Sequence, residues 1–347
     1  MKIAVITVFN SHNYGSFLQA RALGEALRSY GDVTFYNSKT RNNFKIFIGK
    51  AKRTIKFREK LSDILKGPFY EFKEWLQIRK CWKSLSSSTE IGHSDVVALG
   101  SDEIWNITRA VCRFPVYWGG GIDAFCFSYA PSVNQSTVED FAAYPEYIDY
   151  LRQIDRLSVR DTHSQKVITE LAQRKAQIVL DPTLLQKPKE ETFRFDRPYI
   201  AVYVFEGSLG KEDQNRIIRF AREKGMPLIS AGQFLNWCDR CVHSRDGNPF
   251  FIFKDAAYVI TNTFHGTAYA INYEAQFISF GKAKPKIKSM LAQFGMEDRI
   301  VDKNATINEI ADKTIDYSVI NDRLHTLREQ SLAYIESAID EYQHTKE

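Results

Sequence analysis

Short runs of consecutive apolar residues alternate with longer amphipathic segments along the chain. The first run covers residues 2–9, and a helical pattern with Ala20, Leu23 and Leu27 on one stripe begins at residue 16. Strands that are apolar at every position, with helical patterns between them, are typical of a parallel sheet covered on both faces. Further strand-like runs stand at residues 33–36, 95–99, 125–129 and 177–180. The pattern therefore predicts a doubly wound α/β domain in the N-terminal half.

The same pattern restarts after a polar, proline-containing stretch at residues 181–198. Strand-like runs follow at residues 199–205, 227–230, 258–261 and 277–280, and a long helix is expected at residues 317–344. We predict an N-terminal Rossmann-like domain over residues 1–185 and a C-terminal one over residues 186–347, which includes the terminal helix. In such folds ligands bind at the carboxyl ends of the strands, so a central cleft between the domains is expected.

Composition adds few constraints. The 347 residues are 44% hydrophobic and 26% charged, which is ordinary for a globular protein. The first apolar run is too short for a membrane span and lacks the flanks of a signal peptide, so a cytoplasmic location is expected.

Five scattered cysteines do not indicate a disulfide framework. Cys238 and Cys241, with His243 beyond, have metal-like spacing, but one such pair favours reduced structural thiols, and we predict no metal site.

Positive charge is concentrated in one segment. Residues 41–83 contain 13 Lys and Arg against 4 Asp and Glu, whereas the whole chain carries a net charge of only +5. This segment is interpreted as a helical insertion at about residues 41–86 with one buried face. The alternative is peripheral contact of residues 44–83 with an anionic membrane surface, because aromatic and aliphatic residues are interleaved with the bases. No nucleic-acid-binding signature is present, so a nucleic-acid partner is not expected.

Four polar segments are expected at the carboxyl edges of the sheets. A Gly turn that opens a helix at residues 13–16 offers backbone N–H groups to an anion. After the strand at residues 95–99, Asp102 is a candidate base, and Trp105 is a candidate platform for a sugar ring. Arg160 follows a short strand and suits a carboxylate or phosphate. His265 stands at a helix N-terminus, where an imidazole can act as acid or base.

Structural interpretations remain open beside these functional ones. Residues 13–16 also fit an ordinary βα turn, Asp102 a helix cap, Trp105 the core, Arg160 a surface salt bridge and His265 a helix cap. The candidate catalytic residues are His265, Arg160 and Asp102. The candidate substrate-binding residues are Asn13, Tyr14, Gly15, Ser16, Gly100, Ser101, Trp105, Asn262, Thr263, Gly266 and Lys286.

These segments, in this order, resemble the polysaccharide pyruvyl transferase family. The likeness rests on NYGSFLQARAL at residues 13–23, GSDEIWN at 100–106, SVRD at 158–161, LDPTLL at 180–185 and VITNTFHGTAYAI at 259–271. The resemblance implies a GT-B-like fold of two Rossmann-like domains. Two positions depart from the family pattern: Glu103 stands where Gln is common, and Thr263 stands where Ser or Arg is usual. Lys286 or Lys288 would then supply the missing positive charge at the donor.

The resemblance also implies an activity. The pyruvyl group of phosphoenolpyruvate would pass to two hydroxyls of one sugar, giving a pyruvate ketal and phosphate. Arg160 and His265 match family positions associated with donor binding and catalysis. The acceptor is expected to be a cell-surface polysaccharide or its lipid-linked precursor, as in capsule or exopolysaccharide synthesis, and no cofactor is expected beyond the donor. Two alternatives stay open: a GT-B glycosyltransferase that uses a nucleotide sugar, and a non-catalytic scaffold in polysaccharide assembly.

Overall fold

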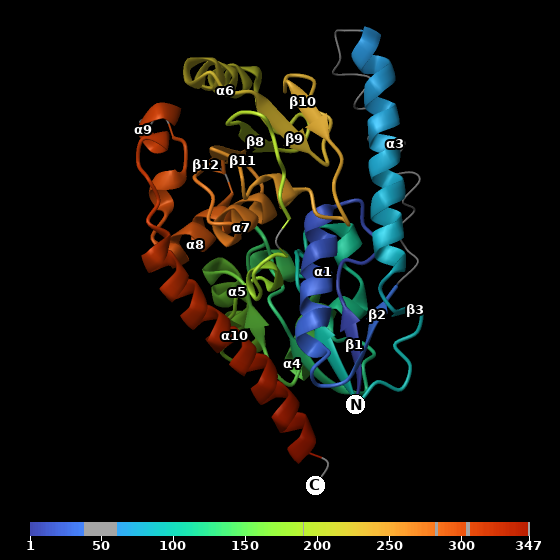
Figure 1. Ribbon diagram of the computed structural model, residues 1–347. Helices are drawn as coiled ribbons and strands as arrows, with labels where there is room; N and C mark the ends of the chain where they lie inside the picture. The colour runs from blue at the N-terminus through green and yellow to red at the C-terminus, as the bar shows by residue number, and fades with distance from the viewer. Residues whose placement is uncertain (38–60, 190, 282–283, 303–305, 346–347) are drawn as a thin grey trace.

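Two five-stranded parallel sheets form the centre of the protein (Figure 1). The computed structural model describes residues 1–37, 61–189, 191–281, 284–302 and 306–345. The first sheet has the order β3-β2-β1-β4-β5 and the second the order β10-β9-β8-β11-β12. The strands of the first sheet are β1 (Lys2–Ile6), β2 (Asp32–Tyr36), β3 (Ser87–Ser88), β4 (Val96–Leu99) and β5 (Phe125–Ser128). Those of the second are β8 (Ile200–Tyr203), β9 (Leu228–Ala231), β10 (Arg240–Val242), β11 (Tyr258–Thr261) and β12 (Phe277–Ser279). A separate parallel pair consists of β6 (Ser158–Val159) and β7 (Gln177–Ile178).

Helices connect the strands, and side chains cap several of their N-termini. Asn13, Asp161 and Thr263 each accept a hydrogen bond from a backbone N–H in the first turn of the helix that follows. Gly225 and Gly295 end two other helices in the left-handed conformation. The helices are α1 (Tyr14–Leu27), α3 (Leu61–Lys83), α4 (Pro145–Gln153), α5 (Thr162–Ala172), α6 (Lys211–Lys224), α7 (Phe264–Asn272), α8 (Pro285–Phe294), α9 (Ile307–Ala311) and α10 (Tyr317–His344).

Each sheet has one topological switch point, where the strand order reverses. In the first sheet β1 pairs with both β2 and β4, and in the second β8 pairs with both β9 and β11, always in parallel. The chain therefore leaves two neighbouring strands in opposite directions at β1/β4 and at β8/β11. A crevice opens beyond the carboxyl ends of such strands. The two sheets thus provide two switch points, and the expectation of a GT-B-like, doubly wound α/β fold is confirmed.

The N-terminal half of α1 packs directly against the second domain. A Cβ on Gly247 would come within 2.7 Å of the Phe17 ring, and one on Gly232 within 3.0 Å of the Tyr14 ring. Glycine is therefore required sterically at both positions, and both also have positive φ angles of 74° and 67°. One continuous cluster of buried apolar side chains extends from β1 and α1 to β9 and α7.

Helix α3 joins the two domains along one side of the molecule (Figure 1). The buried carboxylate of Glu74 accepts hydrogen bonds from Tyr14 Oη in the first domain and from Ser244 Oγ, at 2.9 Å, in the second. Tyr70 Oη donates to the carbonyl oxygen of Val242. The structure thus shows a helix in the C-terminal part of the predicted insertion, whereas the part of that insertion up to residue 60 lies outside the described residues.

Helix α10 crosses back from the second domain to the first (Figure 1). Its Tyr334 Oη donates to the carbonyl oxygen of Ser128 at 3.0 Å, and Tyr342 Oη donates to Asp95 at 3.0 Å. The sequence pattern assigned the whole helix to the C-terminal domain, but its far half packs on β5 because Tyr334, Ile335, Ala338 and Ile339 form a buried stripe there. None of the helices described has the length and apolar character needed to cross a bilayer.

Element boundaries differ from the predictions at three places that matter for the site. Strand β1 ends at Ile6 rather than at residue 9, so Val8 belongs to the loop before α1. Helix α7 begins at Phe264, so His265, which was expected at a helix N-terminus, lies inside the first turn. Helix α1 begins at Tyr14 rather than at residue 16, which places Gly15 and Ser16 in its first turn.

Candidate functional site

A cavity of about 520 Å³ lies between the two domains, at both switch points. The first domain contributes the loop after β1, with Asn13 and Ser16, and the loop after β4, with Asp102 and Glu103. The second contributes residues after β8 and β11 and the start of α8. The other lining residues are Val8, Ser11, Arg109, Cys112, Asn134, Gln135, Tyr203, Phe205, Thr263, Phe264, His265, Lys284, Pro285 and Lys286. The size suits a small organic anion together with part of a sugar.

Asp102 is held in the wall of the cavity as a carboxylate. Ser16 Oγ donates to its Oδ2 at 2.6 Å, and the backbone N–H of Glu103 donates to its Oδ1 at 2.9 Å. Burial alone would raise the pKa of Asp102, but the positive charge of Arg160, and that of His265 once acid protonates it, outweigh that effect and lower the pKa to about 2. A carboxylate with so low a pKa is a weak base. The candidate role of Asp102 therefore changes from proton acceptor to electrostatic stabiliser.

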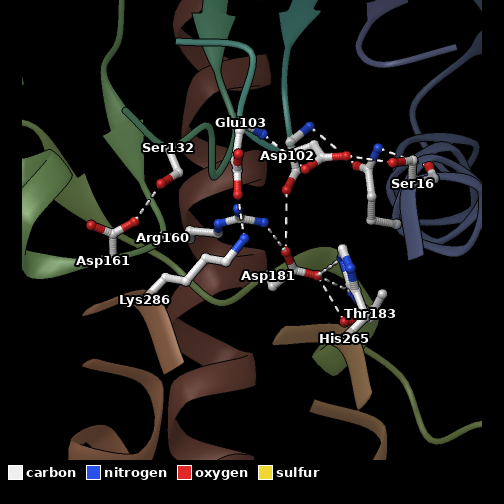
Figure 2. A network of polar contacts seen from close by, with 12 residues as sticks. Ser16, Asp102, Glu103, Ser132, Arg160, Asp161, Asp181, Thr183, His265 and Lys286 are labelled. Atoms are coloured by element: carbon white, nitrogen blue, oxygen red, sulfur yellow. Dashed lines mark hydrogen bonds and ion pairs between the residues drawn. The ribbon is translucent and has the colours of Figure 1, made fainter. Parts of the chain in front are cut away.

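Arg160, Asp181 and His265 form a chain of polar contacts beside the cavity, in which Arg160 and Asp181 are an ion pair (Figure 2). Arg160 Nη1 donates to Asp181 Oδ2 at 3.0 Å, and His265 Nε2 lies 3.8 Å from Asp181 Oδ1. The guanidinium also lies over the ring of Phe264, 4.4 Å from its centroid. Asp181 comes from the segment that joins the domains, so its carboxylate connects an arginine of the first domain to a histidine of the second.

The imidazole of His265 is mostly neutral at neutral pH. Burial lowers its pKa below the usual histidine value, and the carboxylates of Asp181 and Asp102 only partly offset that effect. Its Nε2, together with Nε and Nη2 of Arg160, is buried and has no hydrogen-bond partner in the described structure. Buried polar atoms are nearly always paired in proteins, so this cluster has unused hydrogen-bonding capacity beside the cavity.

Positive charge gathers at the start of α8. Lys286 pairs with Glu103 (Figure 2). The other carboxylate oxygen of Glu103 lies 3.7 Å from Arg109 Nη1. Lys284 Nζ donates to the carbonyl oxygen of Asn262 at 2.6 Å, and burial and the nearby Lys286 lower its pKa. Pro285 occupies the first helical position, and the first turn has no acidic residue. Two lysines beside the positive end of a helix dipole form a setting that favours an anion.

The cavity brings together six of the residues that the sequence singled out. They are Asn13, Ser16, Asp102, Thr263, His265 and Lys286. Glu103 also lines the cavity, where Lys286 and Arg109 balance its charge. Lys288, the other lysine considered at the donor, is exposed on α8 and is absent from the cavity wall.

Two aromatic candidates are core residues in the structure. Trp105 is fully buried, stacks on Trp118 with 5.9 Å between the ring centroids, and donates its indole N–H to the carbonyl oxygen of Tyr117. It is not placed to stack on a sugar in the cavity. Tyr14 is also buried, and its hydroxyl points away to Glu74. Contrary to expectation, neither residue lines the cavity, because Trp105 packs in the core and the Tyr14 hydroxyl is bound by Glu74.

The expected free N–H groups of two helix starts are already used. Gly15 N–H donates to Asn13 Oδ1 at 2.9 Å, and Gly266 N–H donates to Thr263 Oγ1 at 2.9 Å. Side-chain caps therefore replace the anion that was expected at these two amides. Gly15 has a steric role instead, because a Cβ there would overlap the imidazole of His265. Helix α1 thus approaches the histidine as closely as a glycine allows.

The remaining candidates lie behind the cavity wall. Arg160 is buried there and reaches the site only through Asp181 and its charge. Ser101 Oγ donates to Asp181 at 3.3 Å, and the backbone of Gly100 packs against Tyr129. The side-chain amide of Asn262 donates to Ser208 Oγ at 2.9 Å. None of these four residues lines the cavity.

The sequence model of the polysaccharide pyruvyl transferase family matches residues 13–282. The match covers most of the chain and contains every motif on which the resemblance rested. The chain belongs to this family. Among curated proteins, none matches the sequence at a meaningful level.

Solved structures similar to this member of the pyruvyl transferase family share its fold at low identity. S. aureus MnaA in complex with UDP is 10% identical with a TM-score of 0.53, and the match covers 99% of this chain and 97% of that one. UDP-GlcNAc 2-epimerase from Neisseria meningitidis, bound to UDP-GlcNAc, is 9% identical with a TM-score of 0.52, covering 98% and 100%. A putative UDP-N-acetylglucosamine 2-epimerase from Listeria monocytogenes is 10% identical with a TM-score of 0.51, covering 98% and 96%. These likenesses establish the GT-B-like fold.

Sequence reasoning about this pyruvyl transferase family member missed three charged residues of the site. Asp181 lies three residues after the end of β7, near a strand end, where functional carboxylates are often found. Because Pro182 follows it, the sequence pattern assigned Asp181 to the linker between the domains. Lys284 lies two residues before Lys286 in the same basic stretch, but only Lys286 and Lys288 were considered at the donor. Arg109 had no recognisable signal, because it reaches the cavity from an irregular loop.

Cys238 lies two residues before β10 and Cys241 lies within it, and neither lines the cavity. Neither forms a disulfide, and burial raises the pKa of Cys238 well above its usual value. In the part of the chain that the structure describes, no three metal-binding side chains gather closely enough to hold an ion.

Proposed function

We propose that this protein transfers the pyruvyl group of phosphoenolpyruvate to a sugar of a cell-surface polysaccharide or its lipid-linked precursor, with release of phosphate. The observation that carries the proposal is the cation-rich interdomain cavity beside a neutral histidine. Arg109, Lys284 and Lys286 line it, against the carboxylates of Asp102 and Glu103. Phosphoenolpyruvate carries a phosphate and a carboxylate, so it needs such a group of cations.

The start of α8 is the proposed phosphate site. Lys284 and Lys286 flank Pro285 there and add two ammonium groups to the helix N-terminus. A bound phosphate would compete with Glu103 for Lys286. The donor would then displace the ion pair between Lys286 and Glu103 when it binds. Arg160 and Asp181 act from below by setting the charge and position of His265.

The residues suit an addition–elimination reaction. Protonation of the methylene carbon makes C2 electron-poor, and the Asp102 carboxylate stabilises the positive charge that develops there. Lys284 is the candidate proton donor, because its lowered pKa makes its ammonium a stronger acid. One sugar hydroxyl attacks C2 and gives its proton to neutral His265, which passes it to the departing phosphate. The second hydroxyl closes the ketal and returns a proton to Lys284, so protons balance over the cycle.

Phosphate release tests the proposal. Wild-type protein is incubated with phosphoenolpyruvate and a panel of free and lipid-linked oligosaccharides, and phosphate and pyruvylated glycan are both measured. We expect release that requires an acceptor and falls by about a hundredfold or more in His265→Asn, as is typical for loss of an acid–base group. His325→Asn, on an exposed face of α10, serves as the matched control. Normal turnover by His265→Asn would refute the role of the histidine.

Transfer from a nucleotide sugar is the second candidate. The observation in its favour is that the structures of S. aureus MnaA and the N. meningitidis epimerase, which share this fold, contain UDP and UDP-GlcNAc. A thermal shift with a nucleotide sugar and none with phosphoenolpyruvate would favour it. The cation-rich corner at α8 supports the phosphoenolpyruvate donor instead, because Lys284, Lys286 and Arg109 converge within one small cavity.

A further inference from the structure

The charged residues of α3 are segregated by sign. Within residues 66–83, both acidic side chains, Glu71 and Glu74, are buried against the body of the protein. All the basic side chains of the same span are exposed, namely Lys66, Lys73, Arg79, Lys80 and Lys83. The outward face of this part of α3 therefore carries only positive charge. In a solvated helix of ordinary kind, acids and bases share the exposed face.

Large apolar side chains lie on the same exposed face. Phe69 is 61% exposed, Phe72 41% and Leu76 47%. Their spacing of three and four residues places them on one stripe of the helix, between the basic side chains. Lys73 Nζ lies over the ring of Phe69, 4.6 Å from its centroid, so the stripe and the bases are in direct contact. This face is an amphipathic surface of three apolar residues framed by five cations.

The opposite face of α3 is fixed to both domains. Glu74 binds Tyr14 and Ser244, Gln77 donates to the carbonyl oxygen of Ser244, and Phe234 N–H donates to Glu71 at 3.4 Å. Trp82 is buried and packs on Phe17 with 5.2 Å between the ring centroids. Rotation of the helix would break these contacts. The exposed stripe therefore cannot turn inward to become part of the core.

We propose that the outer face of α3 docks this protein on an anionic lipid bilayer. Phe69, Phe72 and Leu76 would enter the boundary between headgroups and acyl chains, and the bases around them would contact anionic headgroups. The occupant is a bilayer because a row of aromatic and aliphatic side chains with bases on both flanks matches an interface that is apolar below and negatively charged above. Long basic side chains can extend from such a stripe to the headgroups. This inference does not depend on the donor or on the reaction.

Docking through α3 would hold the cleft at a defined position relative to the membrane. Helix α3 stands along one edge of the molecule, beside α1 and β10 (Figure 1). Through Glu74 and Tyr14 it contacts the start of α1, which contributes Ser16 to the cavity wall. The same helix thus connects the proposed lipid surface to the site.

Co-sedimentation with lipid vesicles tests the proposal. The full-length protein is mixed with vesicles of phosphatidylcholine alone or with phosphatidylglycerol added, at low and at physiological salt. We expect binding to the anionic vesicles only, weakened by salt, and reduced by about tenfold in Phe69→Ser/Phe72→Ser/Leu76→Ser. Lys73→Gln/Arg79→Gln/Lys80→Gln should reduce it similarly. The matched control is Val319→Ser/Leu332→Ser, which removes two exposed apolar residues from α10 and should bind as the wild type does.

Three outcomes would overturn the proposal. The first is an absence of wild-type binding to anionic vesicles. The second is unchanged binding by either triple variant. The third is concentration-dependent self-association without lipid that the apolar triple variant abolishes, because the face would then bind a second copy of the chain. Circular dichroism and the unfolding midpoint of each variant show whether its fold is intact, and the exposed positions of all six residues favour that result.

Discussion

At the scale of single residues, the site depends on a histidine that burial keeps neutral. Burial lowers the pKa of His265 by more than the carboxylates of Asp181 and Asp102 raise it, so the pKa lies below the usual histidine value. An anion bound in the cavity would add negative charge and raise it again. A bound phosphorylated donor therefore makes the neutral histidine a stronger base towards the hydroxyl proton that it later passes to phosphate.

Proton uptake on donor binding follows from this balance. At neutral pH, above the lowered pKa, His265 of the unliganded protein is mostly unprotonated. A bound dianion should raise its pKa towards the solution pH, so that a fraction of the molecules takes up a proton and the neutral remainder is ready to accept one from the sugar. Calorimetry of phosphoenolpyruvate binding in two buffers with different ionisation enthalpies measures the protons taken up. We expect net uptake of a fraction of a proton in the wild type. His325→Asn should show the same uptake, whereas equal uptake by His265→Asn would show that another group titrates.

The sequence indicated which residues follow strand ends, whereas the roles assigned to those residues stay predictions. Ser16, Asp102 and His265 all follow strand ends at the switch points, and the structure brings them to one cavity. Trp105 shared that position but lies in the core, because its indole fills space against Trp118. Arg160 was expected in the cleft, yet the carboxylate of Asp181 holds it below the wall. Such pairings depend on tertiary contacts that one sequence does not reveal.

At the scale of elements, the starts of α1, α7 and α8 converge on the cavity. Helix α1 comes so close to α7 that Gly15 has no room for a side chain beside the imidazole of His265. Thr263 and Asn13 cap their own helices, so the first turns are rigid where they meet. The apolar pattern predicted the order of strands and helices. It did not predict the contact between α1 and α7, because a single glycine such as Gly15 can stand in a turn for several reasons other than a close helix contact.

Replacing Gly15 with alanine tests this close approach. The new methyl group should displace His265 by a fraction of an ångström or more, and turnover should fall by about tenfold to a hundredfold, since small misplacements of reacting groups are costly. Alanine favours helix, so local helix stability should not fall. Gly210→Ala is the matched control, because a Cβ there meets nothing within 4 Å. Unimpaired turnover in Gly15→Ala would mean that the contact has no role in positioning the histidine.

At the scale of the whole molecule, two similar halves face each other and are held together by helices that cross between them. The sequence pattern predicted both halves and the long helix at residues 317–344, which the structure places at Tyr317–His344. It did not predict that α10 would return to the first sheet or that α3 would reach β10. Those crossings depend on buried contacts such as Tyr334 to Ser128 and Glu74 to Ser244, between residues that are distant in sequence.

Calorimetric titration with phosphoenolpyruvate, compared with UDP-GlcNAc, tests the central claim most directly. We expect micromolar binding of phosphoenolpyruvate, weakened by about tenfold or more in Lys284→Ala because a charged hydrogen bond to phosphate is lost. Lys288→Ala, on the exposed side of the same helix, should bind as the wild type does. Binding of UDP-GlcNAc without binding of phosphoenolpyruvate would contradict the account and would assign the cavity to a nucleotide-sugar donor.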